Sequence, residues 1–183
     1  MSKLCRMMTD LELAKRARNG DRTAFQHLLE RHYGTAYRVA LRYAGNVADA
    51  EDIAQDICLA LASKIKSFRG RSRFSTWLYR VIVNACRDYT RKQKSTQSLQ
   101  ANYAIYRELD DADQVHNAER LSWLNEAITG LEPKLRETAV LVLAEALSHA
   151  EAASILDCAE STVSWRMHEV RKKLQAQVET THD

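Results

Sequence analysis

Residues that interrupt helices are scarce in this chain. Five Gly and one Pro occur among 183 residues, whereas globular sequences average about 7% Gly and about 5% Pro. Because these residues are the strongest breakers of regular structure, their scarcity favours helices joined by short connections. We therefore predict an all-α fold. A chain of this length can form one domain or two small ones.

Apolar residues at three- and four-residue spacing predict four helices in the first half. Their expected ranges are 9–20, 21–45, 47–65 and 75–92. Thr9 and Glu12 form a capping box, and Asp21 and Ser75 are expected to cap later helices. The stretch 47–65 is the most regular, and its expected buried stripe comprises Ile53, Ala54, Ile57, Leu61 and Ile65.

In the second half, the apolar spacing and the capping residues predict shorter helices over 119–129, 133–146, 148–156 and 161–178. Ser148 and Glu151 form a second capping box, and Ser161 is expected to cap the last helix. A short helix, a turn over 157–160 and a longer helix that starts with polar residues are typical of a helix-turn-helix. The expected buried stripe of that longer helix is Val163, Met167, Val170, Leu174 and Val178.

Two small helical domains joined by a linker account for this pattern. Between them, helical periodicity is lost and Ser, Gln, Asn and Asp predominate, as in an interdomain linker. The predicted ranges are 9–94 for the first domain, 95–118 for the linker and 119–178 for the helix-turn-helix domain.

Charge is divided unevenly between the two halves. Residues 1–94 hold 19 Lys and Arg against 9 Asp and Glu, a net charge of +10. Residues 95–183 hold 8 against 15, a net charge of −7. The first half is therefore the expected nucleic-acid-binding half.

The segment 64–94 concentrates this positive charge, with ten Lys and Arg against one acid. Its aromatic residues are Phe68, Phe74, Trp77, Tyr79 and Tyr89. A basic surface with exposed aromatics would hold a nucleic-acid backbone and stack on unpaired bases. Alternatively, the segment is a solvated basic helix whose aromatics belong to the core. Arg80, Asn84, Arg87 and Arg91 share one helix face at spacings of four, three and four, which suits phosphate binding around a base contact.

Acidic and amide side chains crowd the first two turns of the helix 47–65. They are Asp49, Glu51, Asp52, Gln55 and Asp56. Favourable interaction with the helix dipole, worth about 0.3–1 kcal/mol per acid, accounts for one or two of them. The rest indicate a docking surface for a protein partner.

The expected recognition helix of the helix-turn-helix presents a polar face for the major groove of DNA. Its members are Ser161, Thr162, Ser164, Trp165, Arg166, His168 and Arg171. Trp165 lies off the buried stripe, so we expect it to be exposed rather than part of the core.

Two segments together resemble a known family. The sequences DAEDIAQD at 49–56 and FSTWLYRVIVNACRD at 74–88 resemble the second region of extracytoplasmic-function sigma factors of bacterial RNA polymerase. The sequence LSHAEAASILDCAESTVSWRMHEVRKKL at 147–174 resembles the fourth region of the same family. The resemblance covers about 21–94 and 119–176, in the family's order.

The resemblance implies a role for each surface. The acidic helix would dock on the clamp helices of the largest subunit of core RNA polymerase, and the flap of the second subunit is a further implied contact. The loop residues Lys66, Arg69, Arg71 and Arg73 would open the minus-ten promoter element with Asn84 and trap a flipped base, while Arg80, Arg87 and Arg91 would bind phosphates. The recognition helix would read the minus-thirty-five element. An anti-sigma factor is the implied inhibitor.

Some residues depart from the family pattern. Ser161 stands where the family often has Gly, Ser164 where it often has a basic residue, and Glu169 where it often has Arg. Because the changes at Ser164 and Glu169 remove two positive charges and add a negative one, we predict weaker phosphate contacts in the second domain. Trp165 replaces a small polar residue, which predicts an unusual recognition sequence.

Other classes of protein fit the sequence less well. The four Cys show no metal-ligand spacing, and no phosphate loop or nucleophile motif is present, so we expect no enzyme activity, no metal and no cofactor. No apolar run approaches the length of a membrane span and no signal-peptide core precedes residue 10, so a cytoplasmic protein without membrane insertion is expected. The alternative is a stand-alone helix-turn-helix regulator, which would leave the acidic helix unexplained.

Overall fold

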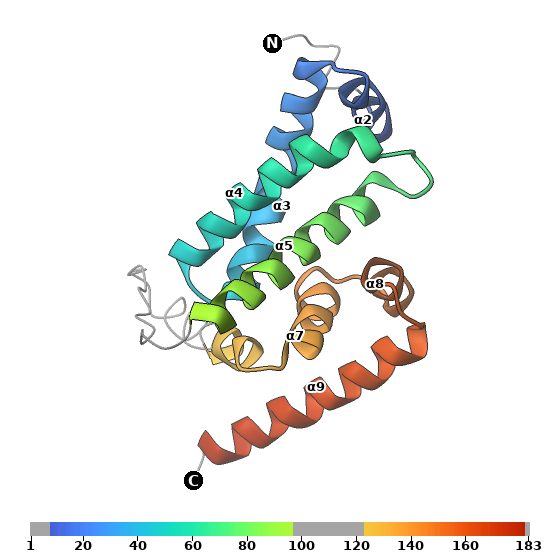
Figure 1. The fold of residues 1–183 in the computed structure, drawn as a ribbon. Coiled ribbons are helices and arrows are strands. Elements are labelled where there is room, and N and C mark those ends of the chain that lie inside the picture. Colours follow the sequence, from blue (N-terminus) through green and yellow to red (C-terminus); the bar gives the residue numbers. More distant parts are fainter. Residues whose placement is uncertain (1–7, 97–122, 182–183) are drawn as a thin grey trace, which may run out of the picture.

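The fold is built from helices alone in the part of the chain that the structure describes. The computed structural model describes residues 8–96 and 123–181, and within these ranges no strand occurs (Figure 1). The predicted all-α class is therefore confirmed. The expected linker, 95–118, falls almost entirely outside the described residues, and the exact domain limits stay predictions.

The first domain packs four α-helices and one 3-10 turn. They are α2 (Asp10–Arg18), α3 (Arg22–Ala44), α4 (Val47–Lys64), η1 (Ile65–Ser67) and α5 (Phe74–Thr96). The predicted capping box opens α2, because the Thr9 backbone N–H donates to Glu12 Oε2 at 2.8 Å and Thr9 Oγ1 accepts from the Glu12 N–H at 3.3 Å. Gly45 ends α3 with φ of 82°, a backbone angle that Gly adopts at little cost.

The core of this domain includes the predicted stripe of α4. Ile53, Ala54, Ile57, Leu61 and Ile65 are all buried. All of them except Ala54 share one core cluster with buried residues of α3 and α5, among them Tyr43 and Leu78. One prediction here is wrong: Ser75 does not cap α5, because the helix already begins at Phe74. Phe74, the first residue of the helix, is buried in the core.

The second domain contains a helical segment at 123–129 and four further elements. They are α7 (Pro133–Ala139), the π-helix η2 (Val140–Ala144), α8 (His149–Leu156) and α9 (Glu160–Thr181). The capping box of Ser148 and Glu151 is confirmed at the start of α8. The predicted continuous helix to residue 146 is wrong, since its end is a π-helix and Ala146 has φ of 53°.

The helix-turn-helix is formed by α8 and α9. Val163, Met167 and Val170 are fully buried as predicted, but Val178 is 40% exposed because α9 continues beyond the rest of the domain (Figure 1). Ser161 lies inside the first turn of α9, which begins at Glu160, so its predicted capping role is wrong. No helix in the two described ranges combines the length and hydropathy needed to cross a membrane.

The two domains pack directly against each other along α5 (Figure 1). Val83 of α5 is buried in the core of the second domain, while Ile128 and Val140 are buried in the core of the first. At the same junction, a Cβ added to Gly45 would lie 2.7 Å from Thr129 Cγ2. The two cores are therefore joined across a close-packed interface.

Candidate nucleic-acid and polymerase interface

The acidic surface of α4 lies open to solvent over most of its length. Glu51, Asp52, Gln55 and Asp56 are exposed. Asp56 Oδ2 forms an exposed ion pair with Lys92 Nζ of α5 at 3.2 Å, an arrangement that contributes little in water. These four side chains are available to a protein partner.

Asp49 differs from the other members of the predicted docking surface. It is half-buried and accepts hydrogen bonds from the Tyr89 hydroxyl and from Asn46 Nδ2, each at 2.6 Å. Burial and the bond to Asp49 raise the pKa of Tyr89. Asp49 therefore fastens the start of α4 to α5 rather than facing outward.

The loop between η1 and α5 presents charge outward and aromatic rings inward. Lys66, Arg69, Arg71 and Arg73 are exposed. Phe68 and Phe74 are 3% and 5% exposed, with their ring centroids 5.6 Å apart and the rings nearly perpendicular. Both rings belong to the core, so the reading in which these two would stack on bases is wrong.

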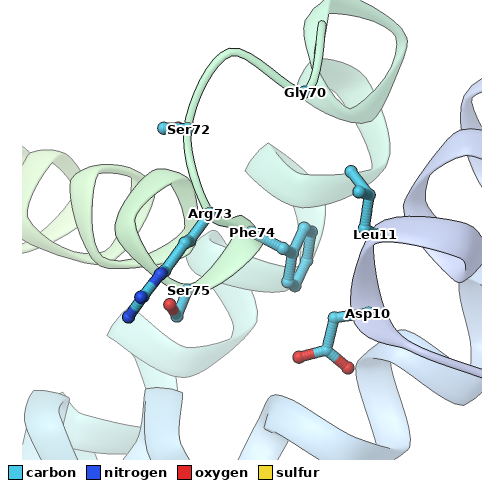
Figure 2. A pocket seen from close by; sticks show the side chains of 7 residues that line it. All are labelled: Asp10, Leu11, Gly70, Ser72, Arg73, Phe74 and Ser75. Atoms are coloured by element: carbon cyan, nitrogen blue, oxygen red, sulfur yellow. The ribbon is translucent and has the colours of Figure 1, made fainter.

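A cavity of about 410 Å³ opens beside this loop (Figure 2). It is lined by Asp10, Leu11, Gly70, Ser72, Arg73, Phe74 and Ser75. Asp10 is held by Arg31 Nη1 at 2.6 Å and by His32 Nε2 at 2.9 Å. The sequence-based reading overlooked the contribution of α2, since Asp10 and Leu11 lie about sixty residues before the loop. Asn84 does not line this cavity.

The predicted face of α5 is only partly free. Asn84 is exposed, and Arg91 pairs with Asp88 on the same helix. Arg87 Nε and Nη2 donate to the two carboxylate oxygens of Glu137, each at 2.8 Å. Arg80 Nη2 donates to the carbonyl oxygen of Ser154 at 2.6 Å. Two of the three predicted phosphate-binding arginines thus contact the second domain.

A second carboxylate, Glu145, lies in the same interface. It accepts from Arg38 Nη2 and from the Tyr79 hydroxyl, each at 2.8 Å, and from Arg42 Nη1 at 3.1 Å. The side chain of Glu145 is 2% exposed and that of Glu137 is 3% exposed. Sequence reasoning missed both residues. The available signal was the acidity of the second half, together with acids inside otherwise apolar helical runs.

The helix α9, predicted to be the recognition helix, is accessible on its polar side. Trp165 is 61% exposed, as predicted. Ser161, Ser164, His168 and Arg171 are exposed, whereas Thr162 and Arg166 are half-buried. Ser164 Oγ lies 2.9 Å from Nδ1 of His149 on α8. Across residues 8–96 and 123–181, no group of His, Cys, Asp and Glu gathers in a way that could hold a metal ion.

Comparison with known proteins matches both domains. The family model of sigma-70 region 2 matches residues 28–96, and that of sigma-70 region 4 matches residues 121–174. The ECF RNA polymerase sigma factor SigW of Bacillus subtilis is 32% identical over 90% of this chain and 94% of its own length. The ECF RNA polymerase sigma factor SigM of Mycobacterium tuberculosis is 33% identical over 91% and 83%.

Solved structures with both domains are also similar. CnrH, solved in complex with the cytosolic domain of CnrY, has a TM-score of 0.67 at 27% identity and covers 93% of this chain and 97% of its own. RpoE of Bartonella quintana, solved with the anti-sigma factor NepR, has a TM-score of 0.64 at 25% identity over 85% and 96%. On these matches, the chain belongs to the extracytoplasmic-function (ECF) group of RNA polymerase sigma factors.

Proposed function

We propose that the three surfaces described above divide the work of promoter recognition. The exposed acids of α4 dock on core RNA polymerase, the basic loop and α5 open the minus-ten element, and α9 reads the minus-thirty-five element. The observation that carries this assignment is Asn84, exposed on α5 between arginines. An amide can hydrogen-bond a base edge while flanking guanidinium groups hold phosphates.

The cavity beside the loop is the proposed site for an unpaired base. Its volume of about 410 Å³ falls in the range of small-ligand pockets. Figure 2 shows the Phe74 ring facing Leu11 and Asp10, with Arg73 directed to the other side. Ser72, Ser75 and Asp10 offer hydroxyl and carboxylate groups for a base edge, and Arg73 can hold the adjacent phosphate.

The proposed docking surface is narrower than the sequence suggested. Glu51, Asp52, Gln55 and Asp56 are its members. Asp49 is a supporting residue, because its carboxylate already accepts from Tyr89 and Asn46. The polymerase partner is expected to present a basic surface, since opposite charges steer association and fix its register.

An anti-sigma factor is the proposed inhibitor. CnrH and RpoE are similar to this chain along most of its length, and RpoE was solved with its anti-sigma factor. We also propose that the chain acts in the cytoplasm, where core polymerase and DNA are found, as an initiation factor without catalytic activity of its own. We expect a protein that covers the basic loop and the polar face of α9 to co-purify with this chain and to inhibit it.

Run-off transcription with core polymerase and a promoter library tests the function. The chain is expected to direct initiation from a subset of promoters and thereby return its recognition sequence. A chain that binds duplex DNA but neither binds core polymerase nor supports initiation would instead be a stand-alone regulator.

A charge-reversal variant tests the docking surface. Asp52→Lys with Asp56→Lys is expected to abolish polymerase binding, measured by pull-down, while circular dichroism remains unchanged. Glu30→Lys, an acid of α3 whose side chain is 48% exposed, is the control and is expected to bind normally. Normal binding by the double variant would contradict the assignment of this surface.

A further inference from the structure

The contact between the two domains occupies the side chains that the proposed function assigns to DNA. Arg80 and Arg87 lie on either side of Asn84 along α5, and both bind groups of the second domain. A DNA strand on this face would need the same guanidinium groups for its phosphates. The contact and the DNA therefore compete for the same side chains.

The chemistry of the contact imitates a phosphate backbone. The Arg87 guanidinium grips both oxygens of Glu137 at 2.8 Å, and this two-point geometry also joins arginine to phosphate. Arg80 donates from Nε and Nη2 to the Ser154 carbonyl at 3.1 and 2.6 Å. That carbonyl belongs to the last turn of α8, where carbonyl groups lack helical partners and carry partial negative charge.

Glu145 adds a second anchor beside the first. Its carboxylate is held by Arg38 and Arg42 of α3 and by Tyr79 of α5. The side chains of Glu145 and Glu137 are 2% and 3% exposed. A buried carboxylate with no partner is costly, so these two acids strongly favour the arrangement that supplies their arginines.

Apolar packing and a half-buried arginine complete the interface. Val83 of α5 is buried in the core of the second domain. Arg136 of α7 donates to the Tyr43 carbonyl at 3.2 Å and lies 5.2 Å from the Tyr43 ring centroid. Cys86, which is 1% exposed, lines a small cavity together with Glu137 and Leu141 of the second domain. Access to the Cys86 thiol therefore reports on separation of the domains.

We propose that the second domain of the free protein masks Arg80 and Arg87 on the DNA face of α5 by occupying their guanidinium donors. Glu137 stands in for a DNA phosphate at Arg87, and Glu145 anchors the second domain to α3 and to Tyr79. This inference rests on the proposed role of the α5 face. It gives a use to the net negative charge of residues 123–183, which hold 6 Lys and Arg against 10 Asp and Glu. Such a charge is unexpected for a domain that must itself approach DNA. Arg80 and Arg87 stay exposed beside the second domain, so nucleic acid competes with it for their guanidinium donors.

The test variant is Glu137→Gln combined with Glu145→Gln, which removes both charges and keeps the side-chain shapes. Two properties of the full chain are measured without polymerase: alkylation of Cys86, followed by peptide mass spectrometry, and binding of a fluorescent mixed-sequence single-stranded oligonucleotide. We expect Cys86 alkylation to become at least tenfold faster and the oligonucleotide to bind at least tenfold tighter. Circular dichroism checks that the helices are retained.

The matched control is Glu132→Gln, which removes one charge from an acid of the same domain whose side chain is 75% exposed. It is expected to leave alkylation unchanged and oligonucleotide affinity within twofold of the wild type. If the control gained affinity equally, the tighter binding would come from the change in net charge alone, and the proposal would be overturned. Unchanged alkylation in the double variant would also overturn it, because the two carboxylates would then not hold the domains together.

The proposal and the proposed function fail in different ways. If Cys86 becomes accessible while oligonucleotide affinity stays unchanged, masking is wrong. The proposed role of the α5 face is tested separately by Arg80→Ala with Arg87→Ala in transcription by the assembled holoenzyme. Loss of open complexes in that variant upholds the role even where masking fails. The glutamate double variant is expected to transcribe within twofold of the wild type.

Discussion

The polar faces of α5 and α9 are both proposed to contact DNA, but the chain treats them differently. Arg80 and Arg87 on α5 bind the second domain, whereas Trp165 on α9 is 61% exposed. The packing of the two domains thus occupies two arginines of the face proposed for single-stranded DNA, while the helix proposed to read the duplex keeps Trp165 exposed. The difference implies an order of events in which α9 can find its element before α5 is released.

The largest expected effect is on stability, and it distinguishes the buried face of α9 from its exposed face. Met167→Ala should cost about 2–5 kcal/mol of unfolding free energy, because Met167 is fully buried and its removal leaves a cavity. Trp165→Ala, two residues earlier, should change stability by less than about 0.5 kcal/mol. Hydrogen exchange over residues 123–181 in the full chain measures both. Similar losses would mean that the Trp165 ring packs within the domain.

The next effect contrasts DNA reading by α5 and by α9. Asn84→Ala should lower open-complex formation roughly 5- to 150-fold, the range that corresponds to a lost base contact of about 1–3 kcal/mol. Trp165→Ala should weaken binding to the duplex element by a similar factor but leave initiation from a pre-melted template intact. Polymerase pull-down serves as the control for both variants. If Asn84→Ala weakens polymerase binding as much as melting, Asn84 is structural.

A smaller effect on stability is expected from removing either of the two capping boxes. Thr9→Ala and Ser148→Ala should each cost about 1 kcal/mol through loss of the side-chain acceptor at the helix start. Only Ser148→Ala should also speed Cys86 alkylation, because α8 presents the Ser154 carbonyl to Arg80. Faster alkylation in Thr9→Ala would show that the first domain alone controls access to the thiol.

The smallest effect is a pH dependence of closure. Burial alone would raise the pKa of Glu145, but hydrogen bonds from Arg38 and Tyr79 outweigh it and hold the pKa below its ordinary value of 4.5. Closure therefore keeps its full stabilisation above about pH 4.5 and loses it as the pH falls through the lowered value. The contribution is modest, because Arg38 and Arg42 are partly solvated.

Small-angle scattering of the full chain measures this pH dependence as an increase in the radius of gyration on acidification. Glu145→Gln should flatten the change, since its amide does not titrate. An identical acid response in the variant would assign the opening to other groups.

Most of the local structure could be predicted from the sequence, because helix ends and buried faces depend on residues close together in the chain. Both capping boxes, the end of α3 at Gly45 and the apolar stripe of α4 follow from spacing of a few residues. The starts of α5 and α9 were misplaced, since Ser75 and Ser161 lie in first turns rather than before them. The π-helix at Val140–Ala144 escaped notice because its apolar residues fit an α-helical period equally well.

The candidate site was only partly readable for a different reason. Exposure of Asn84 and Trp165 follows from their place on each helix. The partners of Arg80 and Arg87 lie fifty or more residues away, and no local pattern identifies them. Glu137 and Glu145 stand in largely apolar stretches, which indicates burial, but nothing local identifies the arginines that pair with them. The aromatic side chains of the loop region were likewise ambiguous until Phe68 and Phe74 proved to be buried.

Gly45 gives the closed arrangement a steric as well as an electrostatic requirement. It ends α3 in a left-handed conformation, and any side chain there would meet Thr129 Cγ2 of the second domain at 2.7 Å. A methyl group at position 45 would therefore act as a wedge between the domains while every charged residue stayed in place. The absence of a side chain at Gly45 thus lets the positively charged first domain and the negatively charged second domain approach this closely.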